Sequence, residues 1–164
     1  MIKFLEYLLL YILLMPILTF LHELGHAIVA ILYTNDEVLI QIGNGTLDYN
    51  IKIRRLYIKF AGYKSLIQVA YGQVIWKNEC TKFRKIIITA AGPVVSVLVF
   101  LLSTIILYKF YYSLNYKYTI ILRSISFYSL IQFLITAIPL KYKFYPYKYM
   151  TSDGYKIVEL IIKK

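Results

Sequence analysis

Residues 4–33 read FLEYLLLYILLMPILTFLHELGHAIVAILY, an almost uninterrupted run of apolar side chains. A helix of about 20 residues crosses the hydrocarbon layer of a bilayer, which is about 30 Å thick, so this segment can span a membrane and continue beyond it. Pro16 can bend the helix midway. The segment is too long for a signal peptide and has no small-residue cleavage site before Ala27, so we expect it to remain in the mature protein.

Two further apolar segments, residues 86–110 and 118–140, also have the length of membrane-spanning helices. Apolar residues make up 60% of the 164-residue chain and charged residues only 16%, with a mean hydropathy of +0.63. This composition excludes a disordered tail and an ordinary cytosolic enzyme. We therefore predict one membrane domain, residues 1–164, with a core of three transmembrane helices at 4–33, 86–110 and 118–140.

The loop between the first two apolar segments, residues 34–85, contains short strand patterns. Polar and apolar residues alternate from Thr46 to Ile53, which is the period of a half-buried strand, and the turn pair Asn44-Gly45 precedes them. Further strands are predicted at residues 38–42, 56–60 and 65–74. We expect these strands to form a small β-hairpin sheet against the bilayer.

The C-terminal segment, residues 141–164, ends in a predicted short helix. Ser152 or Asp153 can cap this helix, and apolar residues follow from Ile157 onward. The predicted fold class is thus a mostly α-helical membrane protein with a minimal three-helix core, a cytoplasmic-side β-hairpin loop and a short C-terminal helix.

The net charge of +11, from 19 basic and 8 acidic residues, predicts the orientation of the chain. Fifteen basic residues lie in the 34–85 loop and after Leu140, and the other four lie on or near the opposite side. Because Lys and Arg accumulate on the cytoplasmic side, we expect the N-terminus outside the cell membrane and the loop and C-terminus in the cytoplasm. A lipid bilayer explains this charge without a nucleic-acid partner. The frequent Lys, Ile and Tyr residues are typical of a low-GC bacterial source.

Within the first apolar segment, His22-Glu23-Leu24-Gly25-His26 has the pattern HExxH. In a helix, His22 and His26 lie one turn apart on the same face and can bind one Zn²⁺ ion. Glu23 can reach a zinc-bound water and take its proton as a general base. Ionisable side chains in a membrane helix are costly unless they are paired or metal-bound, and these are the chain's only two histidines. The segment therefore predicts a zinc site.

A catalytic zinc usually has three protein ligands, so a third must come from another part of the chain. The acids that follow His26 lie about 15 Å further along a continuing helix or in a predicted strand, which disfavours Asp36, Glu37 and Asp48. Three candidates remain, namely Glu79, Asp153 and Glu159. Asp153 is favoured because Ser152-Asp153-Gly154 is a turn sequence that could return the chain to the first helix.

Several motifs, in order along nearly the whole chain, resemble those of the site-2 protease family of intramembrane zinc metalloproteases (peptidase family M50). Residues 22–27, HELGHA, resemble its catalytic helix, and Ile42-Gly43-Asn44-Gly45 resembles its glycine-containing strand opening. Ala91-Gly92-Pro93 matches the start of its second core helix. Ile138-Pro139, followed by Ser152-Asp153-Gly154, resembles its third core segment.

The resemblance implies a metalloendopeptidase with one Zn²⁺ per chain. By this resemblance His22, His26 and Asp153 are the metal ligands and Glu23 is the general base. Ser96 and Thr136 occupy positions where family members often carry asparagines that hold substrate, so they and Asn44 are the candidate substrate-binding residues. Thirteen residues separate Pro139 from Asp153, more than the compact link of many members.

The resemblance also implies substrates, namely single-pass membrane proteins or signal-peptide remnants cut in or near the bilayer. The strands between Thr46 and Val74 are expected to receive the unwound substrate as an added strand, since an extended backbone must find new hydrogen-bond partners. A homo-oligomer or a regulatory membrane subunit is compatible with the sequence. Two alternatives stay open: a catalytically silent adaptor of the same fold that binds membrane peptides, and a small basic pore-forming protein in which HExxH arose by chance.

Overall fold

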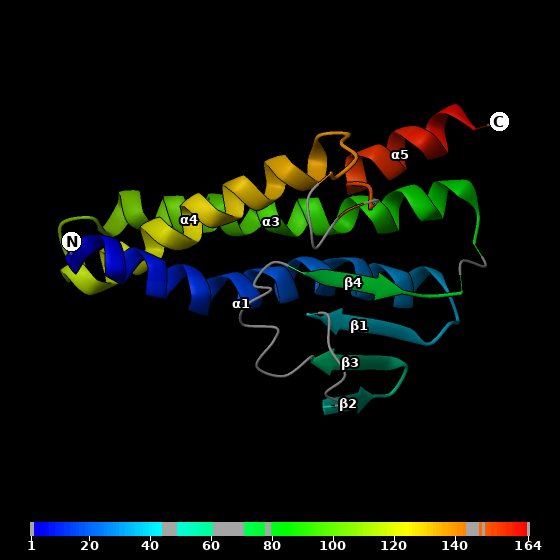
Figure 1. Cartoon of the computed structure of the whole chain (residues 1–164), viewed down its shortest axis with the longest axis horizontal. Helices are drawn as coiled ribbons and strands as arrows, with labels where there is room; N and C mark the ends of the chain where they lie inside the picture. Colours follow the sequence, from blue (N-terminus) through cyan, green and yellow to red (C-terminus); the bar gives the residue numbers. More distant parts are fainter. Residues whose placement is uncertain are drawn as a thin grey trace.

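The computed structural model describes residues 2–43, 49–60, 71–77, 80–143, 148 and 150–163. Figure 1 shows the arrangement of its helices and strands. In chain order they are α1 (Ile2–Tyr33), β1 (Val38–Ile42), β2 (Tyr49–Ile53), β3 (Leu56–Phe60), β4 (Gly72–Ile75), α3 (Lys82–Phe110), α4 (Tyr116–Ala137) and α5 (Asp153–Ile162).

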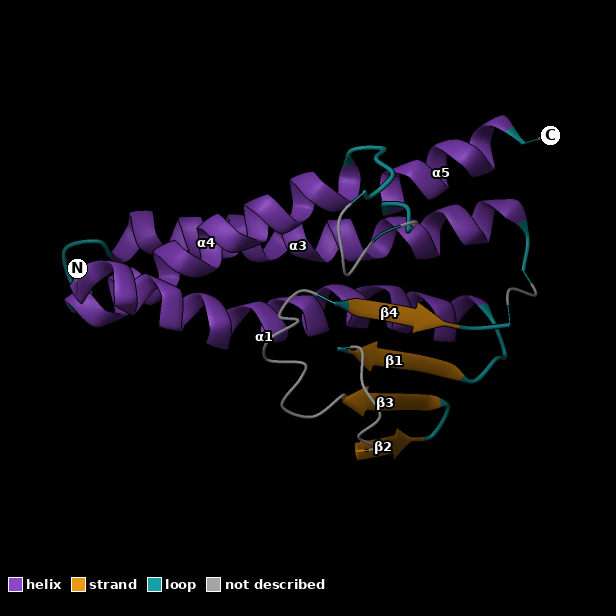
Figure 2. Ribbon diagram, viewed as in Figure 1, coloured by secondary structure: helices purple, strands orange, loops and turns teal. Residues whose placement is uncertain are grey.

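Three helices, α1, α3 and α4, run lengthwise through the molecule (Figure 2). Each is long and apolar enough to cross a membrane, over Leu5–Tyr33, Lys82–Phe110 and Tyr116–Ala137. Large apolar side chains such as Leu13, Leu102 and Phe127 remain about 60% exposed on these helices, as lipid-facing positions require. The three long apolar helices predicted from the sequence are therefore confirmed, and they indicate a membrane protein.

The end of α4 differs from the predicted end at residue 140. Ile138 has an extended backbone (φ −70°, ψ 132°), so the helix stops at Ala137. Pro139 accounts for this difference, because proline disfavours the helical conformation of the residue before it.

The sheet lies beside the C-terminal half of α1 (Figure 1). Its order is β2-β3-β1-β4, with β1 parallel to β3 and the other two pairs antiparallel. β1 is the buried strand, and Val38, Ile40 and Ile42 pack with Ala27 and Ile88 in the core. The sheet is thus mixed rather than a plain hairpin, because β1 pairs in parallel with β3 and antiparallel with β4. The predicted strands at 38–42 and 56–60 are confirmed at those bounds.

Arg55, in the β2–β3 turn, ties the sheet to the end of α1. Its guanidinium donates to the carbonyl oxygens of Thr34 (2.7 Å) and Ile31 (2.9 Å). The last carbonyls of a helix have no partner within the helix, so this contact both caps α1 and fixes the sheet beside it.

Hydrogen bonds join the two ends of the segment that connects α4 to α5. The Ser152 amide donates to the Leu140 carbonyl (3.0 Å), and the Tyr142 amide donates to that of Met150 (2.9 Å). The Ser152 hydroxyl donates to the Ile138 carbonyl (2.7 Å) and accepts from the amides of Leu140 (2.9 Å) and Tyr155 (3.1 Å). Ser152 is therefore the N-cap of α5, and the predicted short C-terminal helix is confirmed. These hydrogen bonds bring Pro139 and Asp153 together in space, although thirteen residues separate them in the sequence.

Candidate metal centre

α1 carries three buried ionisable side chains within two turns. The exposed fractions of His22, Glu23 and His26 are 3%, 8% and 6%. His22 lies 11 residues before the end of the α1 segment at Tyr33, which at about 1.5 Å per residue is about 16 Å along the helix. The three side chains thus lie about half the thickness of a hydrocarbon layer from that end of α1. Uncompensated polar groups are expensive at this depth.

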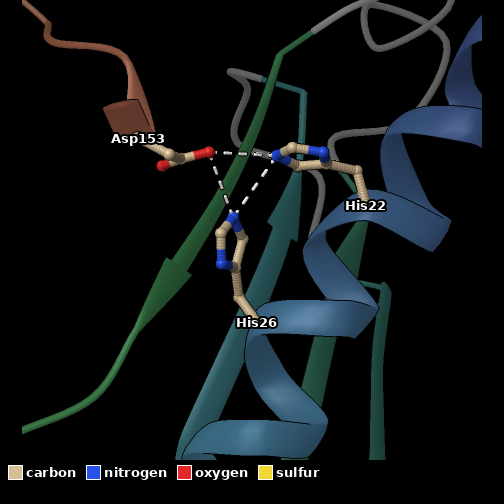
Figure 3. Close-up of side chains that lie close together, drawn as sticks. All are labelled: His22, His26 and Asp153. Atoms are coloured by element: carbon tan, nitrogen blue, oxygen red, sulfur yellow. Dashed lines mark hydrogen bonds and ion pairs between the residues drawn. The ribbon is translucent and has the colours of Figure 1, made fainter. Parts of the chain in front are cut away.

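Asp153, the first residue of α5, points at both histidines (Figure 3). Its Oδ2 atom lies 3.2 Å from His22 Nε2 and 3.3 Å from His26 Nε2, and the two Nε2 atoms are 3.3 Å apart. Two ligand atoms that each bind a tetrahedral zinc at about 2.0–2.1 Å lie about 3.3–3.4 Å from each other. The three atoms therefore form a triangle of the size that one ion requires, and this buried group could hold a metal ion.

Two groups on α3 orient the imidazole rings through their Nδ1 atoms. His22 Nδ1 is 2.9 Å from Ser96 Oγ, and His26 Nδ1 is 2.7 Å from the Ile88 carbonyl oxygen. Since a carbonyl oxygen only accepts, His26 donates from Nδ1 to Ile88, and its Nε2 atom faces Asp153. Metal-binding histidines are commonly held in this way by a second hydrogen bond. Ser96, predicted from the sequence as a substrate contact, lies behind a candidate ligand.

Gly92 leaves room for this arrangement. A methyl group added there would collide with His26 Nε2 and come within 2.7 Å of His22 Nε2. Only a residue without a side chain can therefore let α3 approach the two ligand atoms this closely.

We predict that Gly92→Ala reduces zinc affinity by more than about 10-fold. The added methyl group would force the rings of His22 and His26 to turn, so that their Nε2 atoms could no longer point at one ion. The helix itself should not suffer, since alanine favours helices over glycine by about 1 kcal/mol. Zinc titration and thermal unfolding of the purified variant test this. Ala91→Gly, the reverse change one residue earlier, is the control. Unchanged zinc affinity in Gly92→Ala would refute the packing argument.

The second oxygen of Asp153 faces a lysine. Asp153 Oδ1 lies 3.3 Å from Nζ of Lys156, which is half-exposed at the mouth of the site. Burial alone would raise the pKa of Asp153, but the hydrogen bonds to His22 and His26, with the charge of Lys156, hold it well below its ordinary value. Asp153 is therefore a carboxylate, the form that binds a metal. Burial, with Asp153 nearby, also raises the pKa of Tyr142 to about 12.

A cavity of about 330 Å³ opens onto the candidate metal ligands. Glu23 lines it from α1, Gly72 and Val74 from β4, and Thr136 from α4. The Thr136 hydroxyl donates to the Gln132 carbonyl of its own helix at 2.9 Å. β4 thus forms one wall of the cavity and is also an edge of the sheet among the described strands.

Gly72 packs directly on the predicted base. A methyl group added there would come within 2.7 Å of Glu23 Oε1 and of Thr19 Cγ2. Sequence reasoning missed this contact, because Gly72 follows Glu23 by 49 positions and no local pattern links them. Lys156 was also missed, although its position one turn after Asp153 is visible in the sequence.

The remaining predicted site residues lie elsewhere. Glu159, an alternative third ligand, is on an exposed face of α5, where it pairs with Lys163 at 2.8 Å. Asn44 and Glu79 lie outside the described residues, as does most of the predicted strand at 65–74. No protein family, curated protein or solved structure matches this chain in the comparisons.

Proposed function

We propose that this protein is a zinc-dependent intramembrane endopeptidase of the site-2 protease kind. The observation that carries the proposal is the triangle of His22 Nε2, His26 Nε2 and Asp153 Oδ2, buried within an apolar helix bundle beside Glu23. Two imidazole nitrogens and one carboxylate oxygen, with space left for a further ligand, are the donor set of hydrolytic zinc sites.

Each polar residue of the site has a role in peptide hydrolysis. A bound zinc ion would supply a Lewis acid that polarises the scissile carbonyl and makes a water molecule more acidic. Glu23 then takes a proton from the attacking water and returns it to the leaving nitrogen as the C–N bond breaks. Ser96 and the Ile88 carbonyl keep the histidine rings in place, and Lys156 holds the free oxygen of Asp153.

The cavity supports a substrate that enters as an extended chain. The amides of a transmembrane helix are hidden in its own hydrogen bonds, so a segment must unwind before it can be cut. The edge of β4 beside Glu23 offers the replacement partners, as in strand addition. Single-pass membrane proteins and signal-peptide remnants are the substrates that fit. Their cleavage would occur toward the cytoplasmic side, with the sheet and α5 facing the cytoplasm and the N-terminus outside.

Mapping of cleavage products tests this function. The purified protein is incorporated into liposomes with a library of tagged single-pass segments, and new termini are identified by mass spectrometry. We expect cuts within or near the apolar segments, abolished by a zinc chelator and restored by zinc. Cleavage that survives complete removal of metal would overturn the proposal. Metal-dependent binding of these segments without any cleavage would favour the adaptor of the same fold.

A further inference from the structure

Two residues that line the cavity each carry a buried polar atom with no hydrogen-bond partner among the described residues. These atoms are the hydroxyl oxygen of Thr19, on α1, and the indole nitrogen of Trp76, just after β4. Thr19 is 98% buried, since only 2% of its surface is exposed. An unsatisfied buried polar group costs about 1–3 kcal/mol, so such groups are expected where a ligand completes them.

Thr19 differs in this respect from the other threonines in the helices. Four others donate their hydroxyl protons to the backbone carbonyl four residues earlier, at 2.8–3.2 Å, namely Thr89, Thr104, Thr119 and Thr136. This bond is the usual way to satisfy a threonine in an apolar helix. Thr19 does not make it, so the hydrogen-bond donor of its hydroxyl is unused among the described residues.

The position of Thr19 relates it to the reacting centre. Thr19 precedes Glu23 by four residues and so lies one turn away on the same helix face. Gly72 touches both side chains, because an added methyl group would lie 2.7 Å from Thr19 Cγ2 and 2.7 Å from Glu23 Oε1. Thr19 thus lies beside the proposed general base, and both side chains lie against Gly72, the first residue of β4.

Trp76 lies beyond the other end of the same strand. Positions 72 and 76 are four residues apart, which in an extended strand is about 13 Å. The indole nitrogen can donate a hydrogen bond but cannot accept one, so its partner must present an acceptor. An extended peptide presents such acceptors along its length, in the form of backbone carbonyl oxygens.

We infer that Thr19 and Trp76 are substrate-binding residues, which donate hydrogen bonds to two backbone carbonyls of an extended peptide beside β4. Thr19 serves a residue close to the bond that is cut, and Trp76 serves a residue further along. The inference rests on the proposed function for its substrate but concerns binding alone. The subsite recognises the peptide backbone and not a side chain, and so selects substrates by their ability to unwind.

A binding experiment tests this subsite without requiring cleavage. The parent is the zinc-loaded Glu23→Gln protein in lipid nanodiscs. The probe is a synthetic, tryptophan-free peptide of about 25 apolar residues with lysine ends and a central Gly-Pro-Gly break that favours unwinding. Trp76 is the only tryptophan, so its fluorescence reports on its own surroundings. A fluorophore on the peptide gives the affinity of variants that lack the indole.

We expect the probe to shift the Trp76 emission and to bind saturably. Thr19→Val and Trp76→Phe each remove a donor while keeping most of the side-chain volume, and each should weaken binding about 5-fold with zinc content unchanged. Thr19→Ser should bind as the parent does. Thr89→Val is the matched control, because Thr89 lines the same cavity but its hydroxyl already donates to the Lys85 carbonyl.

Equal affinities of Thr19→Val, Trp76→Phe and the parent would overturn the inference, as would the absence of saturable binding to the zinc-loaded parent. The proposed function fails in a different way. Wild-type protein that binds the probe through Thr19 and Trp76 but never cuts it would contradict the endopeptidase and leave the subsite standing.

Discussion

Glu23→Gln is expected to lower the rate of peptide hydrolysis by about 10³-fold or more while the protein keeps its zinc. Glutamine has nearly the same size and can occupy the same space against Gly72. It cannot take a proton from water, and removal of a general base typically costs about 10²–10⁴ in rate. Turnover of a mapped substrate and zinc per chain, measured on one preparation, test this expectation.

The chain offers a matched control on the same helix. Glu6 also lies on α1 but is exposed near its N-terminus, far in sequence from the metal ligands. Glu6→Gln should leave both turnover and zinc content unchanged. If Glu23→Gln retained full turnover, Glu23 would not be the base and the mechanism would be wrong, even if zinc were bound.

His22→Ala and Asp153→Ala should each lose the metal. Each removes one of the three ligand atoms, and loss of a ligand should weaken zinc binding by more than the roughly 10–100-fold cost of losing a supporting group. Asp153→Ala also leaves Lys156 without its carboxylate partner. We expect neither variant to retain stoichiometric zinc after gel filtration, and neither to cleave substrate.

Glu159→Ala is the control for the aspartate. Glu159 lies on the same helix, α5, but pairs with Lys163 away from the cavity. This variant should bind zinc as wild type does. Zinc that survives Asp153→Ala at wild-type affinity would contradict the assigned ligand set and would direct attention to Glu79, the third acid that the sequence leaves open.

Local patterns account for the parts of the fold that sequence reasoning predicted. The three long apolar helices follow from hydropathy alone, and the strand at 38–42 follows from a short run of mostly β-branched apolar residues. His22, Glu23 and His26 share one helix, so helical spacing was enough to bring them together. The cap of α5 at Ser152 was readable because Ser, Asp and Gly occur together there.

Contacts between distant segments could not be read from the sequence in the same way. Thirteen residues separate Pro139 from Asp153 in the sequence, whereas hydrogen bonds between Leu140 and Ser152 bring the two ends of this segment together. The order of the strands depends on β1 lying between β3 and β4, which no single strand pattern encodes. The contact of Ser96 with His22 spans 74 residues and depends on how two helices pack.

Elemental analysis tests most directly whether His22, His26 and Asp153 hold the proposed catalytic zinc ion. Wild-type protein is purified in detergent without added metal or chelator, and the metals in each chain are counted. We expect one zinc per chain, whose removal by a chelator abolishes hydrolysis and whose stoichiometric return restores it. A folded chain that carries no zinc and binds none on titration would contradict the proposed zinc site.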